Sequence, residues 1–143
     1  MYDTVLLTTD GADDADETFE HATAAAGAYG AALHVLSVVD RREILAADAE
    51  EKDAVRDRLH DTAVTAVEDL AARAREADLE VTTATPEGVP HREILAYADA
   101  EDIGLLVLGT RGRTGPEKRL TLGSTTERVL KGTDRPMLVV DIG

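Results

Sequence analysis

The amino-acid sequence predicts a single α/β domain in which a five-stranded parallel sheet carries helices on both faces. Three observations indicate this class: five short apolar runs, helical patterns between them, and a length of 143 residues, which suits one domain. Strands that alternate with helices at this spacing favour parallel pairing through helical crossovers. We therefore assign residues 1–143 to one domain.

The first half of the chain is predicted to form two strands and two helices. Residues 5–7 are an apolar run, and cap-type aspartates after it begin a helix that Gly30 ends. Residues 33–39 form the second strand, and residues 41–49 are expected to be a linker or irregular turn. Residues 50–77 contain no glycine or proline, and their apolar side chains recur every three or four residues, as in an amphipathic helix.

The second half continues the alternation. Residues 79–85 are predicted to be the third strand, and the Pro-Glu-Gly sequence at 86–88 is expected to turn the chain. Pro90 suits the first turn of a helix that runs to about residue 99. Residues 105–108 are apolar throughout, which is typical of a parallel strand buried on both faces. A further helix and a last strand at residues 137–140 complete the series.

Composition excludes several function classes. The chain has no cysteine, so disulfides, thiolate metal sites and cysteine catalysis are excluded. It carries 29 acidic against 15 basic residues and a formal net charge of −14, which would repel nucleic acid. Concentrated salt shortens the Debye length to about 3 Å at 1 M and screens such self-repulsion. Because lysine is scarce among the basic residues, we expect a salt-adapted organism.

The sequence indicates neither a membrane span nor a signal peptide. Acidic residues occur too early in the chain for a secretory signal. Residues 22–39 carry no formal charge, but they include glycines and a histidine and suit a helix end followed by a buried strand better than a span. We therefore expect a cytoplasmic protein with no membrane partner.

The most informative segment is a glycine-rich loop after the fourth apolar run. Gly109, Gly112 and Gly123 would let the backbone approach a phosphate, and Ser124 opens a helix whose free N–H groups favour an anion. Four basic residues lie between these glycines, namely Arg111, Arg113, Lys118 and Arg119. A solvated loop with Ser124 as a simple helix N-cap is the alternative. The spacing matches neither a Walker loop nor the dinucleotide fingerprint.

The loop resembles the nucleotide-binding signature of the universal stress protein A family, G-x2-G-x9-G-[ST]. Gly109, Gly112, Gly123 and Ser124 match it in residue type, although ten residues rather than nine separate the second and third glycines. The resemblance extends over nearly the whole chain, including the Asp that ends the first strand and the Arg-Pro that precedes the last.

This resemblance implies a Rossmann-like, adenine nucleotide alpha hydrolase-like fold with strand order 3-2-1-4-5. It also implies that the protein binds ATP, or ADP or AMP, with Mg²⁺ near the phosphates. The family usually dimerises through its last strand, here Met137 to Val140, whose edge would otherwise be unpaired. Adenine and ribose contacts are expected at the ends of the first two strands, and phosphate contacts at the glycine loop. The expected nucleotide-binding residues are Thr9, Asp10, Val38, Leu108, Gly109, Gly112, Arg113, Gly123, Ser124 and Thr125.

Three functions remain open from the sequence. The favoured one is a stress-response regulatory module that binds ATP without rapid turnover. The alternatives are a slow ATPase or phosphotransferase, and a dimeric scaffold of the same fold that has lost nucleotide binding. No convincing general base or other catalytic residue is evident, since the four histidines show no metal-binding or triad spacing. Asp13 and Asp14 are interpreted as helix caps rather than as an acidic metal pocket.

Overall fold

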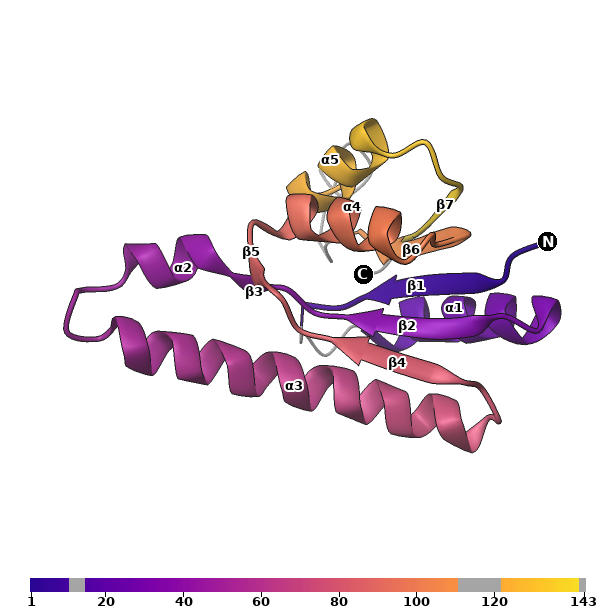
Figure 1. Ribbon diagram of the computed structural model, residues 1–143, viewed down its shortest axis with the longest axis horizontal. Coiled ribbons are helices and arrows are strands. Elements are labelled where there is room, and N and C mark those ends of the chain that lie inside the picture. Colours follow the sequence, from indigo (N-terminus) through magenta and orange to yellow (C-terminus); the bar gives the residue numbers. More distant parts are fainter. Residues whose placement is uncertain (11–14, 111–121, 142–143) are drawn as a thin grey trace.

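The main parallel sheet forms the centre of the molecule. The computed structural model describes residues 1–10, 15–110 and 122–141. Within them, five parallel strands form the sheet in the order β4-β2-β1-β6-β7 (Figure 1). The strands occupy the five segments in which the sequence predicts them. Their bounds are β1 (Thr4–Thr8), β2 (Ala32–Leu36), β4 (Val81–Ala84), β6 (Leu105–Gly109) and β7 (Met137–Val140).

Two short strands outside the main sheet also count in the numbering, so the labels of the main strands are not consecutive. β3 (Val39–Asp40) and β5 (Glu87–Gly88) pair in parallel with each other as a separate two-stranded sheet. The order therefore differs in its labels from the expected 3-2-1-4-5. The predicted end of the second strand, at residue 39, was wrong, because β2 ends at Leu36. The turn predicted at residues 86–88 contains the short strand β5. Two-residue strands are too short for an alternating pattern, so the sequence could not reveal them.

The helices confirm most of the predicted segments. Gly30, with φ of +63°, follows the first helix as expected. The linker predicted at residues 41–49 is wrong, because residues 41–46 are helical and the Asp40 carboxylate accepts a hydrogen bond from Arg42 N at 3.0 Å, which caps this helix. No helix in the described part of the chain is long and apolar enough to cross a membrane. The helices are α1 (Ala15–Tyr29), α2 (Arg41–Ala46), α3 (Lys52–Glu76), α4 (Pro90–Ala100) and α5 (Ser124–Gly132).

Alternation along the central strands produces two cores. In β1, Val5 and Leu7 belong to the cluster under α1 and α3, whereas Leu6 belongs to the cluster under α4 and α5. All three side chains are at most 1% exposed. β2 and β6 repeat this division, which explains why their sequences are apolar at consecutive positions.

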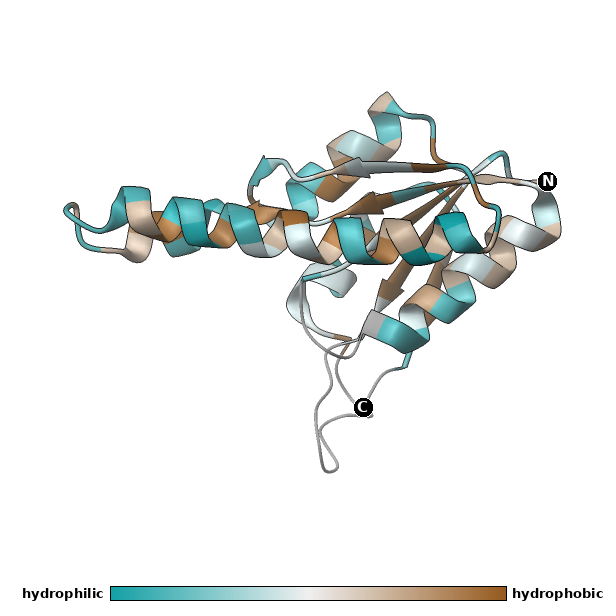
Figure 2. Cartoon of the chain, turned by 90° about the horizontal axis from the view of Figure 1, so that it is seen from below, coloured by the Kyte–Doolittle hydropathy of each residue, from teal (hydrophilic) through white to brown (hydrophobic). Residues whose placement is uncertain are grey.

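The long helix α3 reaches beyond the sheet and forms an arm with α2 (Figures 1 and 2). A third apolar cluster holds the arm together, with Val39, Ile44 and Ala63 buried and two further α3 side chains packed against them. Lys52 Nζ donates to the Leu45 carbonyl at 2.9 Å and joins the two helices at the far end. The arm thus has its own small core, and its base, around β3, lies beside the ends of the main strands.

A histidine is buried on the α4 side of the sheet. His34 in β2 is 9% exposed, and its Nδ1 shares a hydrogen bond with the Tyr97 hydroxyl at 2.7 Å. Burial lowers the pKa of His34 and outweighs the raising influence of the Glu101 carboxylate. His34 is therefore a packed residue, as its place in an apolar strand indicates.

We predict that His34 makes the fold acid-sensitive. Because the folded protein binds a proton at His34 less readily than the unfolded chain does, this contribution should be lost as pH falls below the ordinary histidine pKa of 6.5. Urea unfolding above and below that pH should show a shallower loss of stability in His34→Gln than in the parent protein. His21→Gln, on the exposed side of α1, is the control and should keep the parental pH dependence. Equal slopes in all three proteins would contradict the prediction.

Candidate functional site

A cavity of about 460 Å³ lies where the carboxyl ends of β1, β2 and β6 meet. This size falls in the range of about 300–1,000 Å³ typical of small-molecule sites. Parallel α/β sheets place ligands at this edge, where the chain leaves neighbouring strands toward opposite faces. The described lining residues are Thr8, Thr9, Asp10, Thr18, Leu36, Val38, Asp40, Arg42, Glu43, Pro90, Ile94, Leu108, Gly109, Thr110, Thr125 and Thr126.

The structure brings together six of the residues expected from the sequence. Thr9, Asp10, Val38, Leu108, Gly109 and Thr125 all line the cavity, although they come from four separate parts of the chain. Gly123 and Ser124 are not among the described lining residues, but they directly precede Thr125. Gly112 and Arg113 lie outside the described residues, as do Arg111, Lys118 and Arg119 and the predicted capping residues Asp13 and Asp14.

One end of the cavity, beside the arm, is apolar with a charged rim. Leu36, Val38 and Ile94 contribute apolar side chains there. At the rim, Arg42 donates from Nε and Nη2 to the two carboxylate oxygens of Asp40, at 3.0 and 2.8 Å. This two-bond pair holds the guanidinium in place and raises the pKa of Arg42, chiefly through the hydrogen bond to Asp40. The end can accept a flat, largely apolar group.

The opposite end is built from backbone and hydroxyl groups. Thr126 Oγ1 donates to the Gly109 carbonyl at 3.0 Å, and Thr126 is 5% exposed. Thr110 N donates to the Val140 carbonyl at 2.9 Å and continues the pairing of β6 with β7. The first contact fastens the first turn of α5 to the end of β6, and the second extends the sheet pairing by one residue. Small polar groups here leave room for a hydrophilic part of a ligand.

The N-terminus of α5 excludes the alternative in which Ser124 is the helix N-cap. The N-cap is Gly123, with φ of +86° and ψ of 147°, and not Ser124, which is the first helical residue. Glycine at the N-cap offers no side chain to accept a hydrogen bond from the first turn, and no such bond is present among the described residues. The first N–H groups of α5, at the cavity's polar end, can therefore face an anion.

Sequence reasoning missed several lining residues. Arg42 and Glu43 were assigned to a linker, so their place beside the cavity depended on an unexpected helix. Thr18, Pro90 and Ile94 belong to helices that were correctly predicted, but nothing in a helical pattern tells which residue faces a strand end. Thr8 and Thr110 could have been found, because each is a polar residue at or next to the carboxyl end of β1 or β6. Thr126 directly follows Thr125 in the first turn of α5, so it too could have been included.

The described side chains around the cavity do not form a ready-made metal site. The described residues contain no group of three or more histidines and carboxylates able to hold a metal ion. Asp10 is a lining carboxylate, and Thr125 a lining hydroxyl. Since Mg²⁺ often uses one or two carboxylates together with phosphates and waters, these oxygens fit a cation carried in with a phosphorylated ligand.

We predict that Gly123 cannot be replaced without strain. An alanine at φ of +86° should lower the free energy of unfolding by about 1–3 kcal/mol. Gly27 provides a matched control, because it lies in the exposed face of α1 and an added Cβ would meet nothing within 4 Å. Gly27→Ala should raise stability by about 0.5–1 kcal/mol. Chemical denaturation of the two variants distinguishes them, and an equally stable Gly123→Ala would argue against this backbone conformation.

Comparison with known proteins agrees with this architecture. The family model described as "Universal stress protein family" matches residues 1–141. Universal stress protein MJ0531 of Methanocaldococcus jannaschii is 33% identical over 141 residues, covering 98% of this chain and 82% of the relative.

Solved structures share the fold. The structure of protein MJ0577, also from Methanocaldococcus jannaschii, superposes with a TM-score of 0.84 at 29% identity, covering 99% of this chain and 96% of the other. A universal stress protein solved in complex with cAMP has a TM-score of 0.73 at 24% identity, covering 97% of each chain. The extent of these matches, with the parallel sheet and the cavity at its carboxyl edge, shows that the chain belongs to the universal stress protein family.

Proposed function

We propose that this protein binds an adenine nucleotide, ATP or the related ADP or AMP, in the cavity and acts as a regulatory module in the stress response. The observation that carries the proposal is the polarity of the cavity. Its β2 end offers apolar side chains, and its β6 end offers glycine backbone, threonine hydroxyls and the start of α5. A nucleotide has the same polarity, with a flat base at one end and phosphates at the other.

The base and ribose would lie between the ends of β2 and β1. Val38 and Ile94 can contact the faces of the base, and Asp10 can accept hydrogen bonds from ribose hydroxyls. The cAMP complex of a protein with this fold supports an adenine nucleotide as the ligand class. Six of the ten residues expected to bind the nucleotide line this one cavity, which is further support.

The phosphates would lie against Gly109 and the first turn of α5. N–H groups at a helix N-terminus carry partial positive charge, which favours phosphate oxygens. Gly112, Gly123, Ser124 and Arg113 complete the proposed phosphate site. We propose that Mg²⁺ accompanies the phosphates, with the Asp10 carboxylate and Thr125 hydroxyl as the nearest candidate oxygen ligands.

A binding role is favoured over rapid catalysis. Transfer of a phosphoryl group needs an oriented nucleophile and stabilised charge on the transferring group. Among the described lining residues, the carboxylates are Asp10, Asp40 and Glu43, and Asp40 is already held by Arg42. A slow ATPase remains the second function, and a dimeric scaffold without nucleotide the third, because the glycine loop has one residue more than the family pattern.

We further propose a cytoplasmic homodimer that pairs through β7. This strand is at the edge of the main sheet, and its Leu138 side chain is 37% exposed. An open edge with an exposed apolar side chain favours pairing with another strand. The acidic, lysine-poor composition supports a salt-rich cytoplasm.

We predict that filling the apolar end abolishes nucleotide binding. Val38→Trp should weaken binding of Mg-ATP by at least about tenfold, or 1.4 kcal/mol, because the indole would occupy the base position. Val64→Trp is the control, since Val64 is a 42% exposed side chain on α3 and does not line the cavity. Calorimetry with each protein, purified in high salt, measures the affinity. Unchanged affinity in Val38→Trp would reject the site, and a parent protein that binds no nucleotide would favour the scaffold.

We predict that a charge on the β7 edge dissociates the dimer. Leu138→Lys would place two ammonium groups near the pairing edge, where burial without a partner is unfavourable. Sedimentation of Leu138→Lys should show monomers, while Leu45→Lys, at a 59% exposed leucine on the arm, should remain dimeric. A dimeric Leu138→Lys would place the interface elsewhere.

A further inference from the structure

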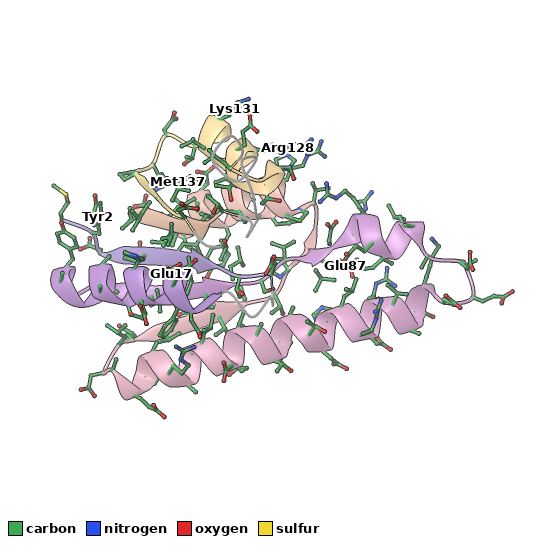
Figure 3. The ribbon with its side chains drawn as sticks, turned by 180° about the vertical axis from the view of Figure 1, so that it is seen from behind. Tyr2, Glu17, Glu87, Arg128, Lys131 and Met137 are labelled. Atoms are coloured by element: carbon green, nitrogen blue, oxygen red, sulfur yellow. The ribbon has the colours of Figure 1, made fainter. Side chains whose placement is uncertain are left out.

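A group of basic side chains lies beside the cavity, at the start of α4 and α5. His91 directly follows Pro90, which lines the cavity, and Arg128 is three residues after Thr125, which also lines it. Residues three apart on a helix share a face, so Arg128 lies on the same face of α5 as Thr125, about 4.5 Å further along the helix axis. Figure 3 shows Arg128 extending outward from α5 on the side nearer to the arm.

The packing of α4 against α5 brings Arg128 close to His91. Both helices return between parallel strands of one sheet, so they run in the same direction. A Cβ on Gly132 would lie 2.8 Å from Leu95 Cδ1, which fixes the register of the two helices. One turn earlier on each helix, the corresponding residues are Arg128 and His91. The same register therefore places these two side chains next to each other.

Several positively charged side chains lie around His91. The pKa of His91 is lowered by burial first and then by the positive charges of Arg128, Arg92 and Arg42. No carboxylate contributes to this shift among the described residues, although the chain has 29 acidic residues. Arg42 is paired with Asp40, whereas the structure's described part gives Arg92 and Arg128 no ion-pair partner.

The carboxylates near Arg128 and His91 in the sequence interact with groups other than these two side chains. Glu127, adjacent to Arg128, accepts from Lys131 Nζ at 2.8 Å, and this hydrogen bond is the main cause of its lowered pKa. Glu93 packs against Gly88, and Glu43 acts on Arg42. These positive charges form a local exception on an acidic surface, and such a cluster without carboxylate partners is suited to binding an anion.

We propose that Arg128 and His91, with Arg92 nearby, form a second phosphate-binding site at the rim of the cavity, beside the first turn of α5. It receives the distal phosphate of a nucleotide held in the cavity, so this inference rests on the proposed function. A free phosphate ion has the same chemistry and is the other possible source. Arg128 supplies a planar set of donors suited to phosphate oxygens, and His91 supplies a ring N–H. The site would favour ATP over AMP.

Calorimetry with AMP and with Mg-ATP tests the nucleotide as the source. Arg128→Ala should lower the affinity for ATP by about tenfold, as expected for loss of a charge-assisted contact, and leave the affinity for AMP unchanged. Arg128→Lys should restore part of the ATP affinity. Arg58→Ala, which removes the same charge from an exposed position on α3, is the control and should change neither affinity.

Inorganic phosphate tests the site without a nucleotide. Titration followed by NMR should shift the His91 imidazole signals, assigned with His91→Gln, in the parent protein but not in Arg128→Ala. A phosphate-dependent shift without an ATP effect would assign the site to free phosphate. Equal losses of ATP and AMP affinity in Arg128→Ala, or neither an ATP effect nor a phosphate shift, would overturn the inference. A protein that binds no nucleotide but shows the shift would refute only the proposed function.

Discussion

The burial of the central strands on both faces is the constraint on which the rest of this structure depends. Val5, Leu6 and Leu7 are consecutive and almost fully buried, which is possible only when helices cover each side of the sheet. Parallel strands then require crossovers, and the crossovers here are α1, α3, α4 and α5. All strands therefore end at the same edge, where loops and helix starts from distant parts of the chain meet.

The meeting of several strand ends at this edge explains why the cavity has one apolar side and one polar side. β1 ends in polar residues that include Thr9 and Asp10, β2 leads toward Val38 and the arm, and β6 ends in Gly109 and Thr110. Each strand end contributes a different chemistry, so one cavity contains an apolar side and a polar side. The proposed binding of an adenine nucleotide uses this division, and the proposed rim site extends the polar side along the first turns of α4 and α5.

Charge in this protein has both a general and a local pattern. The chain has a net charge of −14 from its excess of carboxylates. Three ion pairs in the described residues, Arg56–Asp53, Arg73–Asp16 and Lys131–Glu127, join exposed side chains, and such pairs contribute little each. Against that background, Arg92 and Arg128 stand without ion-pair partners in the described part of the chain. Both side chains lie near His91, whose pKa their positive charges lower. This local cluster of positive charge is the basis of the proposed anion site.

The sequence by itself determined the five main strands, four of the five helices and the part of the chain that supplies the candidate site. These features depend on local signals such as the apolar run at residues 105–108, the capping glycine Gly30 and the long amphipathic pattern of α3. Thr9 and Asp10 were expected from the resemblance to the family, and Gly109 from the glycine-rich loop after the fourth apolar run. All three line the cavity at the carboxyl edge of the sheet.

Only the tertiary structure decided the rest. The pairing of β3 with β5 joins segments more than forty residues apart, and α2 packs against α3 through the cluster of Val39, Ile44 and Ala63. Elements of two or six residues carry too little periodicity to be recognised in the sequence. The place of Arg42 beside the cavity follows from α2, and the meeting of His91 with Arg128 follows from the close approach at Gly132. Local residue patterns specify which elements form, whereas side-chain neighbours across elements are set by packing distances that no single segment contains.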